Sequence, residues 1–65
     1  MPIIQVQMLE GRSIDVKNNL MKEMNEVVCR ILDVSPNQVR ILLNEYSEEN
    51  WSIGGISKAD LSKNK

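Results

Sequence analysis

Apolar and polar residues alternate near the start of the chain, in the segment PIIQVQML at residues 2–9. Ile4, Val6 and Met8 fall on one face of this segment, and two glutamines between them fall on the other. Because successive side chains of a strand point to opposite faces, the period of two predicts a β-strand with one covered face. Two further apolar residues interrupt the alternation, so we expect the second face to be partly covered as well.

From about Ile14 to Asp33 the apolar residues recur at steps of three and four, which is the period of an amphipathic helix. Ser13 is suited to cap this helix, because its side-chain oxygen can accept a hydrogen bond from a free backbone N–H. Pro36 is expected to end it, since proline breaks the helical hydrogen-bond pattern and restricts the residue before it. The apolar positions are Val16, Leu20, Met24, Val27, Val28, Ile31 and Leu32.

A second strand is predicted at residues 39–46, VRILLNEY, where apolar and β-branched residues again dominate. The segment WSIGGI at residues 51–56 is typical of a short hairpin, with Gly54 and Gly55 at its bend. The polar tail from about residue 57 to residue 65 is expected to be flexible or to contact a neighbouring subunit.

The order strand, helix, strand predicts one right-handed βαβ unit with two parallel strands and a C-terminal hairpin, an α/β (α+β) fold in a single domain over residues 1–65. The second strand has apolar residues on both faces, with Leu42 and Tyr46 opposite the others. One helix covers only one face of a sheet. The other surface is therefore expected to meet another copy of the chain, most simply by pairing strands and stacking sheets with two-fold symmetry.

Size and composition also favour self-association. The chain has 65 residues, and a domain of this size buries only about 60% of its unfolded surface. Such a small core usually needs a disulfide, a metal or oligomerisation in addition. Cys29 is the only cysteine and there is no histidine, so the sequence excludes an internal disulfide and a structural zinc site. Oligomerisation remains, in keeping with a chain that is 42% hydrophobic.

Charge and hydropathy exclude two classes of partner. The net charge is −1, and the basic residues are scattered without interleaved aromatic residues, so nucleic-acid binding is not expected. No apolar run approaches the roughly 20 residues that cross a bilayer, and no secretory leader is recognisable, so no membrane partner is expected either. An unpaired cysteine without such a leader favours a cytoplasmic location.

Few residues are suited to chemistry in a chain without histidine, which rules out a Ser-His-Asp or Cys-His site. Pro2 fits the first position of a strand, but removal of Met1 would also expose its secondary amine. Arg40 lies within an apolar strand, where its charge needs a partner; an ion pair, an edge position or a functional role would each explain it. Arg12 suits a surface loop, and Trp51 suits an apolar interface.

Taken together, four segments resemble the 4-oxalocrotonate tautomerase family, the short-chain branch of the tautomerase superfamily. They are MPIIQV at the start, LEGRS at residues 9–13, VRILLNE at residues 39–45 and WSIGG at residues 51–55, and they cover nearly the whole chain in the family's order and spacing. The resemblance implies a βαβ protomer, a dimer with a four-stranded sheet and two helices, and a hexamer formed by three dimers.

The resemblance also implies roles for particular residues. Pro2, freed by removal of Met1, is expected to be the catalytic base. Arg12 is similar to the family arginine that binds a substrate carboxylate. Arg40 matches an arginine, contributed by a neighbouring subunit, that holds the other carboxylate and draws electron density toward the carbonyl oxygen. Trp51 stands where the family usually has a phenylalanine that closes the pocket, so it keeps the apolar wall but adds bulk and an N–H donor.

General chemistry is consistent with such a base. A free α-amino group titrates near pH ~8, and the secondary amine of proline is more basic. Burial of Pro2 against Trp51 and Ile53, together with the positive field of two arginines, is expected to disfavour the ammonium form and lower its pKa. A base poised near neutrality suits proton transfer.

The implied function is a cofactor-independent isomerase that catalyses 1,3-keto-enol tautomerisation of a small unsaturated dicarboxylic acid similar to 2-hydroxymuconate. Two alternatives stay open. A hydratase or dehalogenase of the same superfamily needs a carboxylate to activate water, and Ile53 stands in the region where that acid is sought. A catalytically silent oligomeric or binding protein would keep the fold without the activity.

Overall fold

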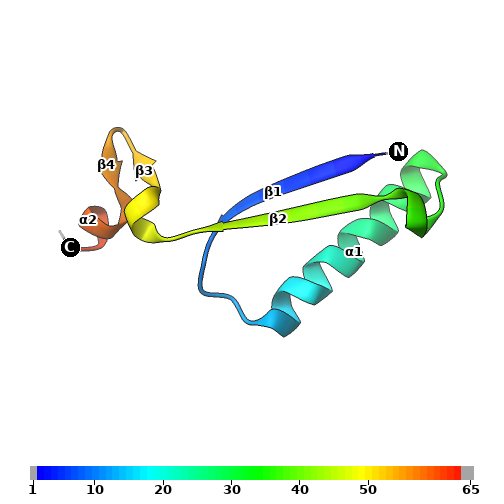
Figure 1. Cartoon of the computed structure of the whole chain (residues 1–65), viewed down its shortest axis with the longest axis horizontal. Coiled ribbons are helices and arrows are strands. Elements are labelled where there is room, and N and C mark those ends of the chain that lie inside the picture. Colours follow the sequence, from blue (N-terminus) through cyan, green and yellow to red (C-terminus); the bar gives the residue numbers. More distant parts are fainter. Residues whose placement is uncertain (1, 64–65) are drawn as a thin grey trace.

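Two parallel strands and one long helix make up most of the chain (Figure 1). The computed structural model describes residues 2–63, so Met1 and its expected removal lie outside the described residues. Strand β1 (Ile3–Leu9) pairs in parallel with β2 (Arg40–Tyr46), from Ile3 opposite Arg40 to Leu9 opposite Tyr46. Helix α1 (Ile14–Leu32) connects them. The predicted βαβ unit with parallel strands is therefore confirmed.

Local sequence signals set both ends of α1. The hydroxyl oxygen of Ser13 accepts a hydrogen bond from the backbone N–H of Val16 at 3.3 Å, which confirms the predicted N-cap. At the other end Asp33 adopts a left-handed conformation, with φ of 56°, and its N–H bonds to the carbonyl of Cys29. A short 3-10 helix, η1 (Pro36–Gln38), then leads into β2.

The helix covers one face of the two-stranded sheet, as the sequence pattern predicts. Ile4, Val6 and Met8 of β1 are half-buried on this face, whereas Leu42 on the opposite face remains 47% exposed. No residue among 2–63 is fully buried in the single chain. The apolar side chains of the open sheet face therefore lack any cover from this chain itself.

The shape of the chain leads to the same conclusion. Its extents are 46 × 24 × 14 Å and its radius of gyration is 15.4 Å. A compact domain of this length has a radius of gyration of about 11 Å. The excess arises because the C-terminal segment lies beyond the end of the sheet instead of packing on it (Figure 1). Within residues 2–63, no helix has the length and hydropathy needed to cross a membrane.

The C-terminal segment begins with a second short 3-10 helix, η2 (Glu48–Asn50), and contains the predicted hairpin. Its strands β3 (Ser52–Ile53) and β4 (Ile56–Ser57) are antiparallel. Gly54 and Gly55 form the bend with φ of 63° and 85°, values that glycine adopts without steric cost.

Residues 58–63, which the sequence pattern predicts as part of a polar tail, form a short helix, α2 (Lys58–Lys63). The side chain of Ser57 accepts a hydrogen bond from the N–H of Asp60 at 3.1 Å, as an N-capping residue does. One turn and a half of polar helix gives too weak a periodic pattern to distinguish it from a tail. Residues 64 and 65 of the predicted tail lie outside the described part of the chain.

Replacement of Ser13 tests the cap of α1. Ser13→Ala is expected to lower the free energy of unfolding by about 1 kcal/mol, because the N–H of Val16 loses its acceptor. Ser13→Asp keeps an acceptor and is expected to retain most of the stability. Urea denaturation followed by circular dichroism, at one fixed chain concentration, measures both variants. An equal loss in both would contradict the capping role.

Candidate active site

Pro2 and Arg40 are neighbours at one end of the sheet. The backbone N–H of Arg40 donates to the carbonyl of Pro2 at 3.0 Å, which extends the β1–β2 ladder by one further hydrogen bond. Pro2 is half-buried. Because the ladder fixes the two backbones, the nitrogen of Pro2 and the first residue of β2 stay at the same end of the molecule.

The side chain of Arg40 is held by backbone carbonyls. Its Nη1 donates to the carbonyl of Asn37 at 2.8 Å and makes a longer contact of 3.5 Å with that of Val39. The only ion pair formed by residues 2–63 is Lys17–Glu45, at 2.9 Å. Arg40 therefore has no carboxylate partner in that part of the chain, and its remaining guanidinium donors are available to a ligand.

The other candidate residues lie at the opposite end of the sheet. Arg12 is exposed in the loop between β1 and α1. The full length of β1 separates it from Pro2, roughly 23 Å at the rise of a strand. Trp51 and Ile53 belong to the C-terminal segment, which leaves β2 at its distal end (Figure 1). A single chain therefore brings Pro2 and Arg40 together but leaves the other three candidates at a distance.

Trp51 and Ile53 differ in how firmly the chain holds them. The ring of Trp51 is half-buried and packs edge-on against Tyr46, with 6.1 Å between the ring centroids and an interplanar angle of 63°. The carbonyl of Trp51 accepts a hydrogen bond from the N–H of Lys58 at 2.6 Å. Ile53, on the hairpin, is 58% exposed. This end of the chain thus presents apolar side chains that it does not cover itself.

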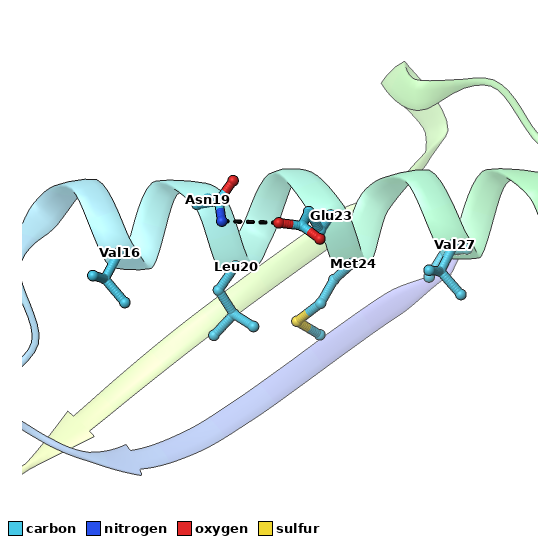
Figure 2. A pocket seen from close by; sticks show the side chains of 7 residues that line it. Val16, Asn19, Leu20, Glu23, Met24 and Val27 are labelled. Carbon is cyan, nitrogen blue, oxygen red and sulfur yellow. Dashed lines mark hydrogen bonds between the residues drawn. The ribbon is translucent and has the colours of Figure 1, made fainter.

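A groove of about 540 Å³ runs along α1, away from all of these residues (Figure 2). Its only polar side chains are Asn19 and Glu23, and the amide of Asn19 donates to the carboxylate of Glu23 at 2.8 Å. An apolar stripe of this kind is typical of a helix that packs against another element, and it holds no candidate catalytic group. Its lining is Val16, Asn19, Leu20, Glu23, Met24, Val27 and Val28.

A sequence model of the family described as "Tautomerase enzyme" matches residues 2–61. The chain therefore belongs to the tautomerase family. A 2-hydroxymuconate tautomerase of Pseudomonas putida is 40% identical over 55 residues, which cover 85% of this chain and 87% of the relative. The resemblance deduced from the sequence is thus confirmed, and membership of the family supports tautomerase activity.

Solved structures of tautomerases confirm the fold of the protomer. A 4-oxalocrotonate tautomerase isozyme of Methylibium petroleiphilum superposes with a TM-score of 0.93 at 44% identity, over 98% of this chain and all of the other. A heterohexameric 4-oxalocrotonate tautomerase of Chloroflexus aurantiacus superposes with a TM-score of 0.86 at 34% identity, over 94% of this chain and 98% of the other. This tautomerase thus shares its protomer fold with a relative that assembles from several chains.

Proposed function

We propose that this tautomerase catalyses 1,3-keto-enol proton transfer on a small unsaturated 2-hydroxy or 2-oxo dicarboxylic acid similar to 2-hydroxymuconate. The single observation that supports this most is the match to the tautomerase family over residues 2–61, a range that contains Pro2, Arg12 and Arg40. The backbone bond from Arg40 to Pro2 keeps these two residues at the same end of each chain, and no carboxylate among residues 2–63 pairs with Arg40. The 40% identity to a 2-hydroxymuconate tautomerase supports the substrate class.

The amine of Pro2 is the proposed general base once Met1 has been removed. While Met1 is attached, the same nitrogen belongs to a tertiary amide and has no useful basicity. The free amine takes the proton of the enol hydroxyl, which breaks an O–H bond, and delivers it to a carbon of the conjugated system, which forms a C–H bond. One base at both ends of the shift makes a separate acid unnecessary.

Two arginines are proposed to bind the dianionic substrate. Arg40 stabilises the charge that develops on the enolate oxygen, where a guanidinium is most effective in a water-poor site. Arg12 holds the distal carboxylate through two parallel hydrogen bonds. Trp51 and Ile53 close the cavity with apolar surface, and together with the two cations they lower the pKa of the Pro2 amine.

This site requires more than one chain, and we propose a homohexamer built as a trimer of dimers. The two ends of the sheet are too far apart for Pro2 and Arg12 of one chain to meet. No described residue is fully buried in the single chain, and both the open sheet face and the groove on α1 expose apolar side chains. These surfaces need other subunits to cover them. The heterohexameric relative supports an assembly of six chains. That Arg40 comes from a neighbouring subunit, and that the protein is cytoplasmic, stay predictions of the sequence.

Pro2→Ala tests the general base. The variant is expected to lose about tenfold or more in turnover, because alanine leaves a primary amine that is less basic than the secondary amine and lacks the ring that holds the nitrogen in place. In the unaltered protein kcat/KM is expected to rise with pH as the amine loses its proton. The midpoint of this rise is expected below pH ~8, the ordinary pKa of an α-amino group. Loss of enol absorbance gives the rates. Intact mass must show that Met1 is absent from both proteins. Full turnover in protein that retains Met1, in which the Pro2 nitrogen is an amide, would refute the assignment.

Arg12→Gln tests recognition of the distal carboxylate. The KM for 2-hydroxymuconate is expected to rise tenfold or more, since a hydrogen bond to a charged group contributes roughly 1.5–3 kcal/mol. A monocarboxylic enol such as phenylenolpyruvate should be little affected. Arg30→Gln is the matched control, because Arg30 is an exposed arginine in the last turn of α1. Equal losses on both substrates would argue against a carboxylate clamp at Arg12.

Mixed assemblies test whether each site takes Pro2 and Arg12 from different chains. Pro2→Ala and Arg12→Gln chains are unfolded together, refolded in equal amounts and assayed against each variant refolded alone. Random mixing in a symmetric oligomer leaves both native residues in about a quarter of shared sites, so kcat/KM, measured well below KM, should recover to about that fraction. If both residues came from one chain, every site would lack one of them and no recovery would occur.

A further inference from the structure

Tyr46 connects three parts of the chain at the distal end of the sheet. It is the last residue of β2 and lies opposite Leu9 of β1. Its hydroxyl donates to the side-chain oxygen of Gln7 at 2.6 Å, and its carbonyl accepts from the N–H of Glu10 at 2.9 Å. Its ring packs edge-on against Trp51. One side chain is thus attached to β1 at its tip and to the C-terminal segment along its ring.

This arrangement restrains the rotamer of Trp51. The hydroxyl bond to Gln7 restrains the direction of the Tyr46 ring, because the acceptor extends from a strand whose backbone is paired with β2. An edge-to-face pair of aromatic rings then biases the orientation of the second ring by about two- to tenfold. The backbone of Trp51 is held separately, by its bond to Lys58. Without Tyr46 the indole would keep its backbone anchor but lose its lateral support within this chain.

Tyr46 is also hydrogen-bonded to the start of the loop that carries Arg12. Glu10, whose N–H bonds to the carbonyl of Tyr46, precedes Arg12 by two residues. At the distal end of the sheet, Tyr46 therefore contacts both the start of the loop that carries Arg12 and the ring of Trp51. We propose that Tyr46 is a positioning residue that holds the indole of Trp51 in one orientation and thereby sets the width of the substrate pocket. This inference rests on the proposed function, in which Trp51 forms the wall.

The fluorescence of Trp51 tests this directly, because the chain contains one tryptophan. Time-resolved anisotropy of the assembled protein measures the amplitude of fast indole motion. Tyr46→Leu removes the ring and the hydroxyl, and is expected to increase that amplitude about twofold or more. Tyr46→Phe keeps the ring and should give an intermediate value. Gln7→Leu removes the same hydrogen bond from the other side, so it should match Tyr46→Phe.

Kinetics test the consequence for the pocket. Tyr46→Phe is expected to raise KM for the dicarboxylic enol severalfold while kcat changes less than about twofold, since the loosened wall affects binding more than proton transfer. In a Trp51→Ala background, Tyr46→Phe should change KM little further, because the indole that Tyr46 orients is absent. Equal effects with and without Trp51 would overturn the positioning role.

The two measurements separate this inference from the proposed function. Unchanged anisotropy in correctly assembled Tyr46→Leu would show that Tyr46 does not hold the indole, whatever the activity. Unchanged anisotropy in Tyr46→Phe and Gln7→Leu would overturn the part of the restraint that runs through the hydroxyl bond to β1. A protein with Met1 removed and no tautomerase activity would instead refute the proposed function, while the anisotropy would still decide whether Tyr46 restrains Trp51. Gln7→Leu also keeps the test informative if Tyr46→Leu fails to assemble.

Discussion

The parallel pairing of β1 with β2 is the constraint on which the rest of the structure depends. Its ladder is flanked by the bond from Arg40 to the carbonyl of Pro2 and by the bond from Glu10 to the carbonyl of Tyr46. The first places Pro2 beside Arg40, and the second fixes the start of the loop that leads to Arg12. A slip of one residue would turn every side chain of one strand to the other face, so both ends of the proposed site depend on this register.

A single protomer pairs the backbones of its two long strands but does not fully bury its apolar side chains. One helix covers one face of two strands, and no residue among 2–63 becomes fully buried. In the proposed assembly, association buries the remaining apolar surface and also brings Arg12, Trp51 and Ile53 of one chain to Pro2 of another. Stability and the complete site then arise in the same step, because the site residues lie at opposite ends of each protomer.

The apolar wall of the proposed pocket illustrates how substrate fit can depend on residues outside it. A tryptophan has more surface and more orientations than a smaller aromatic residue, so its direction decides how much of the cavity remains. Here the direction is coupled to β1 through Tyr46 and Gln7. The sheet that positions the proposed base therefore also restrains the opposite wall.

The sequence by itself determined the local elements: the first strand, the helix capped by Ser13, and the bend at Gly54 and Gly55. Each follows from a pattern within neighbouring residues, whose period or backbone preference is readable without a partner. The family followed from the order and spacing of four segments spread over nearly the whole chain. Only the tertiary structure decided that Tyr46 bonds to Gln7, 39 residues away, and that Arg40 lies beside Pro2. Such contacts depend on which strands pair and in which register, and local patterns carry no record of that choice.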